Sequence, residues 1–257
     1  MEKPAETPHD LLFKNAFSAP RQAVPVLKGI LPPALIKALD WNTLKLAPSE
    51  WVDHQLVRRH NDLLYTIQQR DSREPALVYV LLEHQSTVDR FMAWRLLGYI
   101  ARIGEWYIRA HKGTKHVPPI IPTVVYHGNG EWTAPLSVRE LYPDSTRQDD
   151  GVAHYAVNLS YQLRDLHREH DSHLHYHTPS DEQWGGFVLW LLKHASQGPL
   201  GPQLKDVLEE LKAVVNHPQN YRVLETIIRY VYGVDDGPLP PGVQRQMIDT
   251  LGNSNVE

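Results

Sequence analysis

Two acidic residues occupy positions suited to chemistry: Asp62 begins one apolar run and Glu83 ends the next. The run before Glu83, residues 76–82 (ALVYVLL), is typical of a strand buried on both faces. Burying an acid is costly unless something is bound to it. Because side chains alternate along a strand, Glu83 and Gln85 share one face, with the backbone carbonyl of His84 between them. If the strand that carries Asp62 lies alongside, these oxygens predict a site for a hard divalent cation that also holds a phosphate.

Strands must position these acids, and the sequence offers three candidates in a row. They are residues 51–57, 62–68 and 76–83, joined by the polar segments RRHN and QRDSREP. Loops this short imply an antiparallel meander. A later strand is predicted at residues 120–126 (IIPTVVY), where the internal proline favours an edge or a bulge.

Helices are predicted on both sides of the meander. Asp10 is a candidate N-cap for a first helix, Pro20 and Pro25 interrupt the chain after that helix, and a short helix is expected at residues 34–39. A long helix is expected at residues 88–111. Its predicted apolar stripe consists of Phe91, Met92, Leu96, Tyr99, Ile103 and Trp106.

The pattern changes near residue 150, which predicts one domain at residues 1–150 and a helical C-terminal region at residues 151–257. The helices expected in that region are residues 183–194, 203–215, 221–232 and 243–251.

Composition excludes several classes of protein. The 257 residues include no cysteine, which excludes disulfides, thiolate zinc sites and a cysteine nucleophile. The N-terminus lacks the apolar core of a signal peptide, and the apolar run 187–192 (FVLWLL) is too short to cross a bilayer. We therefore expect a cytoplasmic protein with no membrane role. The net charge of −4 argues against DNA binding by bulk charge but leaves room for a local basic patch.

Six stretches between residues 9 and 135 succeed one another in the order typical of a known family. They are HDLLFKNAF (9–17), LPPALIKALDW (31–41), NDLLYTI (61–67), LLEHQS (81–86), RLLGYIARIGEW (95–106) and IIPTVVYHGNGEWTAP (120–135). Together they resemble the Rpn family of recombination-promoting nucleases, also described as transposase-like proteins. The C-terminal third matches only in being helical.

The resemblance implies an α/β fold of the PD-(D/E)XK restriction-endonuclease type, with a core of helix, three-strand meander, helix and strand. It also implies metal-dependent hydrolysis of DNA phosphodiesters. By the family pattern, Asp62 is the first acid, Glu83 the second, and Gln85 occupies the slot where the general motif has lysine.

These residue types suit Mg²⁺, with Mn²⁺ or Ca²⁺ as alternatives, because carboxylates hold hard cations while leaving room for water. The expected metal ligands are Asp62, Glu83 and the His84 carbonyl, and the first helix offers Asp10 as an auxiliary acid. A glutamine can orient water but cannot stabilise charge as an ammonium would, so Gln85 predicts slow or regulated chemistry. Each acid also has an ordinary explanation. Asp10 could be a helix N-cap, Asp62 a turn residue after Asn61, and Glu83 a solvated strand end.

Two groups of arginines could contact DNA phosphates. Arg58 and Arg59 precede Asp62, and Arg95, Arg102 and Arg109 recur every seven residues along the long helix. A solvated helix face explains the second group equally simply.

A histidine cluster lies outside the core. It comprises His167, His170, His173, His175 and His177. Imidazole binds zinc, but the spacing matches no zinc motif and the polar residues between them favour a loop. His127 is expected in a turn and could line the site.

These patterns support three functions. The first is an intracellular Mg²⁺-dependent DNA endonuclease linked to recombination, mobile elements or defence against foreign DNA. The second is a catalytically weak DNA-binding or protein-interaction module with the nuclease fold. The third is a zinc protein organised by the histidine cluster. An exposed sheet edge or helix could support a homodimer that cuts both strands of a DNA duplex.

Overall fold

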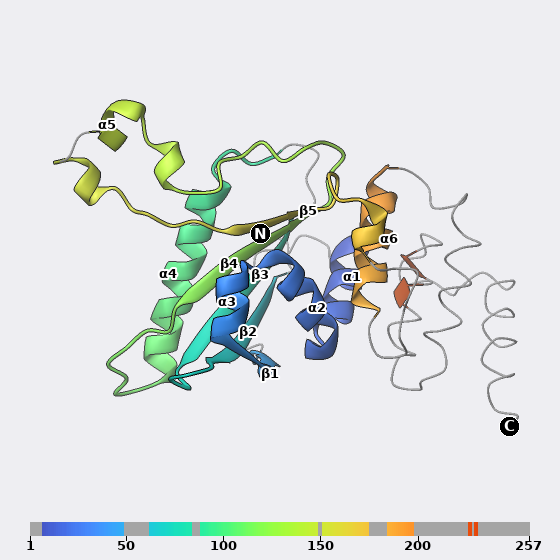
Figure 1. Ribbon diagram of the computed structural model, residues 1–257, viewed down its shortest axis with the longest axis horizontal. Coiled ribbons are helices and arrows are strands. Elements are labelled where there is room, and N and C mark those ends of the chain that lie inside the picture. The colour runs from blue at the N-terminus through green and yellow to red at the C-terminus, as the bar shows by residue number, and fades with distance from the viewer. Residues whose placement is uncertain are drawn as a thin grey trace, which may run out of the picture. The chain divides into compact units, whose positions relative to one another are not determined.

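The structure is a computed structural model and describes residues 7–48, 62–83, 88–148, 151–174 and 184–197, with Thr226, Ile227, Arg229 and Tyr230 (Figure 1). The chain divides into two compact units. The sheet unit comprises Met1–Pro4 and Leu27–Arg168, and the helical unit comprises Ala5–Val26 and Glu169–Glu257. The predicted domain boundary near residue 150 stays a prediction.

The sheet unit is built on five strands in the order β1-β2-β3-β4-β5 (Figure 1). Their bounds are Leu39–Leu46, Leu63–Gln69, Pro75–Glu83, Ile120–Tyr126 and Gln162–Asp165. The first three pair antiparallel, whereas β3, β4 and β5 pair parallel. The mixed sheet confirms an α/β fold with an antiparallel meander, and the strands predicted at 62–68, 76–83 and 120–126 are confirmed.

The first strand of the meander differs from the prediction. It is β1, which begins at Leu39 directly after helix α3 (Pro33–Ala38). The strand predicted at residues 51–57 lies outside the described residues. The pairing of β1 with β2 shifts register between Asp40 and Lys45, and this irregularity interrupts the alternation by which a strand is recognised in sequence.

Strand β4 is internal, so of the two alternatives predicted from its proline, an edge or a bulge, the edge is wrong. It pairs with β3 on one side and β5 on the other. Pro122 is tolerated there because the described pairing with β5 begins only at Thr123, one residue later.

Helix α4 (Met92–Ala110) connects β3 to β4 and covers one face of the sheet. Met92, Leu96 and Ile103 of the predicted stripe are buried against it. The sheet contributes Leu64, Leu77, Tyr79, Val124 and Tyr126 to the same cluster. Phe91 is 60% exposed, so its inclusion in the buried stripe is wrong.

The chain between β4 and β5 makes an excursion with little regular structure. It carries η2 (Arg139–Leu141), α5 (Asp144–Gln148) and η3 (Ala153–Tyr155). An antiparallel bridge between Ser137 and Ser160 closes its base. The sequence did not predict β5, which comes after this excursion.

In the helical unit, α1 (Pro8–Phe17) begins with a capping box. Thr7 is the N-cap, so the prediction that Asp10 has this role is wrong. Asp10 occupies the third helical position: its carboxylate accepts from the Thr7 backbone N–H at 3.1 Å, and the Thr7 hydroxyl accepts from the Asp10 backbone N–H at 3.2 Å. Pro25 lies inside α2 (Pro20–Ile30) rather than interrupting it.

Helix α6 (Gly185–Gln197) packs against α1 and confirms the helix predicted at residues 183–194. Its first N–H groups, of Trp184 and Gly185, donate to the buried side-chain carbonyl of Gln22 at 2.8 and 3.0 Å. A Cβ on Gly185 would lie 2.6 Å from the Gln22 backbone oxygen, so this approach requires glycine. Of the later predicted helices, only four residues between 221 and 232 are described, and they are helical.

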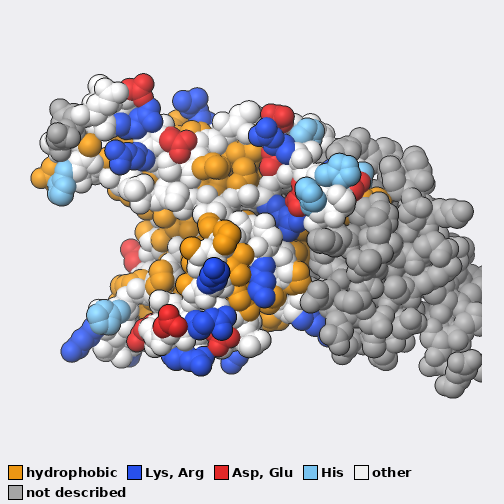
Figure 2. All heavy atoms as spheres, viewed as in Figure 1, with side chains coloured by type: hydrophobic (Ala, Val, Ile, Leu, Met, Phe, Trp, Pro, Cys, Tyr) orange, Lys and Arg blue, Asp and Glu red, His pale blue; other side chains and the backbone are white. Residues whose placement is uncertain are grey.

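No helix in the described part of the chain combines the length and the apolar character needed to cross a membrane. On the face seen in Figure 2, basic and acidic side chains are interspersed among exposed hydrophobic ones.

Candidate functional site

Asp62 lies immediately before β2, and only 8% of its surface is exposed. Within the β2–β3 hairpin, Leu64 pairs with Tyr79. Because side chains alternate, Asp62 and Leu64 belong to the same face as Tyr79, the face covered by α4. The Tyr79 hydroxyl donates to Asp62 Oδ2 at 2.6 Å, and the bond is buried. The structure therefore brings a buried acid and a buried phenol together at the head of β2.

Tyr79 is a donor that remains protonated. Its burial, then the negative charge of Asp62 and the hydrogen bond to it, raise the Tyr79 pKa well above the usual value, while Arg95 acts in the opposite direction. The Tyr99 ring meets the Tyr79 ring edge to face, with centroids 5.9 Å apart. Packing and electrostatics thus hold the hydroxyl on the acid.

Sequence reasoning missed the role of Tyr79. It counted the residue only as part of the apolar run 76–82. The available signal was the single hydroxyl in an otherwise aliphatic strand, because a buried tyrosine hydroxyl usually finds a hydrogen-bond partner.

Arg95, in the first turn of α4, acts on this pair through its charge. Its Nη1 lies 2.9 Å from Asp89 Oδ2, and its Nη2 lies 3.1 Å from the Met92 sulfur. The other oxygen of Asp89 accepts from the Phe91 backbone N–H at 2.9 Å. Arg95 is therefore engaged inside the protein, whereas Arg102 and Arg109 are exposed on the same helix.

The carboxyl ends of the three parallel strands meet in register. Glu83 of β3 pairs with Tyr126 of β4, and Tyr126 pairs with Asp165 of β5. Glu83 is described by its backbone alone, which ends β3 as predicted. The ends of parallel strands are the common place for a site in open α/β sheets.

Asp165 is an acid at this edge that sequence reasoning missed. Its two oxygens accept backbone N–H groups, one from Trp132 at 3.1 Å and one from His167 at 3.1 Å. Asp165 thus ties the chain after β4 to the end of β5. The signal for it was absent, because β5 is short and shows no alternation in burial.

A buried aromatic group supports the same edge. The Trp132 indole lies edge to face with Tyr126, with centroids 5.0 Å apart, and donates to the Tyr161 hydroxyl at 3.0 Å. Gly128 is required here, since a Cβ would lie 2.2 Å from the Tyr126 hydroxyl. His127, predicted to line the site, is completely buried directly after β4.

Several predicted site residues lie outside the described part of the chain. They are Arg58, Arg59, His84 and Gln85. Asp10 belongs to the helical unit, and its role as an auxiliary ligand stays a prediction.

The histidine cluster does not form a metal site within the described residues. Those residues contain no group of three or more His, Cys, Asp or Glu side chains able to hold a metal. His170 accepts from the Ser172 backbone N–H at 3.3 Å and caps η4 (Asp171–His173). His175 and His177 lie outside the described residues.

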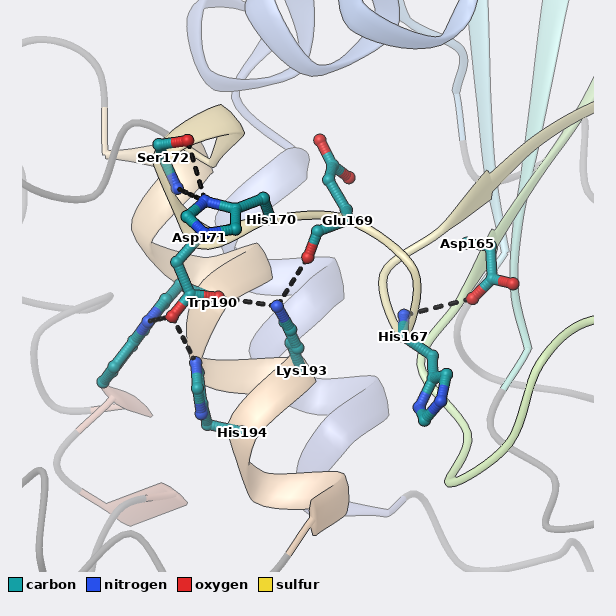
Figure 3. A network of polar contacts seen from close by, with 9 residues as sticks. All are labelled: Asp165, His167, Glu169, His170, Asp171, Ser172, Trp190, Lys193 and His194. Atoms are coloured by element: carbon teal, nitrogen blue, oxygen red, sulfur yellow. Dashed lines mark hydrogen bonds and ion pairs between the residues drawn. The ribbon is translucent and has the colours of Figure 1, made fainter.

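A second acid, Asp171, organises the helical unit (Figure 3). Lys193 Nζ lies 2.6 Å from its Oδ1, and His194 Nε2 lies 2.9 Å from its Oδ2. The Trp190 indole also donates to Oδ2, at 3.2 Å, and Lys193 Nζ donates to the Glu169 carbonyl at 2.6 Å. This network ties residues 169–173 to α6.

Comparison with known proteins identifies the family. The family model described as "Putative transposase, YhgA-like" matches residues 7–221. The chain belongs to this family. No solved structure matches the chain, so the restriction-endonuclease architecture has no structural counterpart among the comparisons.

Relatives of the chain carry the Rpn name. It is 33% identical over 147 residues to recombination-promoting nuclease RpnD of Escherichia coli O157:H7, covering 53% of this chain and 55% of RpnD. It is also 33% identical over 127 residues to recombination-promoting nuclease RpnA of E. coli K12, covering 49% of this chain and 42% of RpnA.

A third relative is named inactive. The protein named inactive recombination-promoting nuclease-like protein RpnE, of E. coli K12, is 28% identical over 155 residues, covering 56% of this chain and 50% of RpnE. The chain thus spans about half the length of these relatives. The resemblance to the Rpn family is confirmed, and that family includes members named as nucleases and members named as inactive.

Proposed function

We propose that this protein is a metal-dependent DNA endonuclease that hydrolyses phosphodiester bonds in recombination, mobile-element biology or defence against foreign DNA. The observation that carries the proposal is the buried Asp62–Tyr79 pair at the head of β2, beside the strand that ends on Glu83. Membership of a family that includes recombination-promoting nucleases supports it.

Asp62 has the chemistry of a ligand for a hard divalent cation. Asp62 is a buried carboxylate, and the Tyr79 donor that holds it is neutral, so this hydrogen bond leaves the negative charge of the acid in place for a cation. In this proposal Asp62, Glu83 and the His84 carbonyl hold Mg²⁺, with Mn²⁺ or Ca²⁺ as alternatives. When bound, the metal supplies charge neutralisation at the phosphate and a water of lowered pKa.

The protein's own residues position the reactants. Tyr79 fixes the rotation of the Asp62 carboxylate through the hydrogen bond to Oδ2. Gln85 orients the attacking water through its amide but adds no positive charge. The expected consequence is slow or regulated cleavage, which a Gln85→Lys variant tests. A variant that cleaves as fast as the parent or faster supports this role of Gln85, and loss of cleavage contradicts it.

DNA is the proposed partner. Arg58 and Arg59 precede Asp62 in the chain, and Arg102 is exposed on α4. We assign these guanidinium groups to DNA backbone phosphates, because phosphate contacts need positive charge and do not read the base sequence. Arg95 belongs to the same set, although it pairs with Asp89 in this structure. A homodimer would cut both strands of a duplex.

A catalytically weak module with the same fold is the second candidate. The observation that favours it is the relationship to RpnE, which is named inactive. In this case the Asp62–Tyr79 pair is a remnant of the site, and the surfaces serve binding alone.

Plasmid nicking decides between the two. The purified protein is incubated with supercoiled plasmid in Mg²⁺, Mn²⁺, Ca²⁺ or EDTA, beside Asp62→Ala and Glu83→Ala variants. Asp144→Ala is the matched control, since this acid is exposed on α5 and pairs only with a surface arginine in the described network. Cleavage by the parent and the control that EDTA and both site variants abolish supports the nuclease. Equal behaviour of the parent and the site variants would leave the binding module.

A further inference from the structure

The start of α4 exposes two aromatic side chains on the side that points away from the sheet. Phe91, directly before the helix, is 60% exposed, and Trp94 is 53% exposed. A Cβ on Gly98, one turn further along this face, would have no neighbouring atom within 4 Å. Phe91 and Trp94 are three residues apart, so their exposed rings are neighbours, and exposed apolar patches rimmed by polar residues mark interaction sites.

The net charge of the segment that carries these rings favours an anionic occupant. Residues 88–116 contain six Lys or Arg and two Asp or Glu, a net charge of +4, whereas the whole chain has a net charge of −4. Arg90 is exposed directly before Phe91, and Arg102 is exposed about two helical turns beyond Trp94. A second copy of the chain would bring the same positive charge against this face, which disfavours self-association.

The aromatic pair lies at the end of α4 that adjoins the candidate site. Trp94 precedes Arg95, whose charge reaches the Tyr79 hydroxyl and which pairs with Asp89. The Phe91 backbone N–H donates to Asp89, which fixes the first turn of the helix. The exposed rings therefore lie within one helical turn of Arg95, whose charge acts on Tyr79.

We propose that Phe91 and Trp94 form a stacking platform for unpaired DNA bases, with Arg90 and Arg102 on phosphates of the same strand. The proposal rests on the nuclease function proposed above and narrows its substrate to DNA with an unpaired segment beside the bond to be cut. Aromatic side chains stack on any base, because every base has a π-face, and nearby arginines track the backbone. Bases in an intact duplex are already stacked on one another and cannot use such a platform without being unpaired.

The test is binding without cleavage. Fluorescence anisotropy in EDTA measures the affinity of the full chain for a labelled oligodeoxythymidylate and for a labelled duplex. Trp94→Ala is expected to weaken binding of the single strand about tenfold or more and to leave duplex binding unchanged, since stacking of one base on an aromatic ring is worth about this much. Trp94→Phe keeps a stacking ring and should retain most of the affinity.

Ile108→Ala is the matched control. Ile108 is 51% exposed near the opposite end of α4, and its side chain cannot stack on a base as an aromatic ring does. The Ile108→Ala variant should bind the single strand and the duplex as the parent does. Because Trp94 is largely solvent-exposed, circular dichroism of Trp94→Ala should match the parent, which separates lost stacking from lost folding.

Four results would overturn the proposal. If Trp94→Ala binds the single strand as tightly as the parent, the stacking proposal is wrong, whereas the proposed nuclease function is unaffected. An equal loss in Ile108→Ala would show a general apolar surface. A changed molar mass of Trp94→Ala in light scattering, with DNA binding unaltered, would assign the face to a second copy. A parent that binds neither probe would overturn both this proposal and DNA as the substrate.

Discussion

Asp62 of the sheet unit and Asp171 of the helical unit are both acids drawn into hydrogen bonds, but they are held by different chemistry. A neutral, buried tyrosine hydroxyl donates to Asp62. An ammonium, an imidazole and an indole converge on Asp171. The first arrangement orients a negative charge, and the second balances one within the protein.

This difference suggests a functional role for Asp62 and a structural role for Asp171. A neutral donor orients a carboxylate without itself neutralising it, which suits a ligand for an external cation. A carboxylate shared between Lys193 and His194 has its charge satisfied locally and instead joins a short segment to a helix. The two acids should therefore respond in opposite ways to the same substitution.

The largest contrast is expected in cleavage. Asp62→Asn should lower metal-dependent plasmid nicking by more than about 100-fold, because a neutral amide is a poor ligand for a hard cation. Asp171→Asn should nick at close to the parent rate. Initial rates with Mg²⁺ at equal protein concentration make the comparison, and equal losses in both variants would contradict the division of roles.

Tyr79→Phe tests the orienting hydrogen bond. The variant keeps the ring that packs on Tyr99 but loses the donor to Asp62, so it should fold and bind metal about 10 to 100 times more weakly. Isothermal titration with Mn²⁺ reads metal affinity independently of turnover. Tyr99→Phe is the control, since it keeps the ring that packs on Tyr79. An unchanged metal affinity in Tyr79→Phe would show that Tyr79 does not orient Asp62.

Asp171→Ala should act on stability instead. Removing the carboxylate leaves the largely buried Lys193 ammonium without its partner acid and should lower the free energy of unfolding by about 1–3 kcal/mol. Urea unfolding measures the change. Asp144→Ala breaks an exposed ion pair and should cost less than about 1 kcal/mol. A loss no larger than that of the control would mean that Asp171 is dispensable.

The smallest effect is a dependence of stability on pH. Partial burial alone would raise the pKa of Asp171, but the hydrogen bonds from Lys193 and His194 outweigh it and lower the pKa from the usual 3.8. A lowered folded pKa gives stability that is complete above the unfolded value and is lost as the pH falls through the folded one. Below about pH 4, the urea midpoint of the parent should fall more steeply than that of Asp171→Asn. Parallel curves would show that the acid contributes nothing to this dependence.

The sequence predicted the parts of the fold whose periodicity is regular. Strands β2, β3 and β4 and helix α4 have long apolar patterns, and each was found close to its predicted place. Strand β1 was missed because a register shift breaks its alternation, and β5 because four half-buried residues carry no pattern.

The site was predictable only in part. Asp62 could be found because an acid at the edge of an apolar run is conspicuous in sequence. Its partner Tyr79 could not be singled out, because the hydrogen bond depends on the pairing of Leu64 with Tyr79, which only the register of two strands determines. Asp165 could not be singled out from the sequence for a related reason. Its place at the site follows from its alignment with the ends of β4 and β3, which only the strand pairing determines.

The connection between β2 and β3 has a consequence for how the protein folds. Only residues 70–74 separate these strands, so closing the hairpin costs little chain entropy. Strand β4 can join only after the chain through α4 is in place, and β5 only after the excursion between residues 127 and 161. We therefore expect the hairpin that carries Asp62 and Glu83 to form early and the strands beside it to add later.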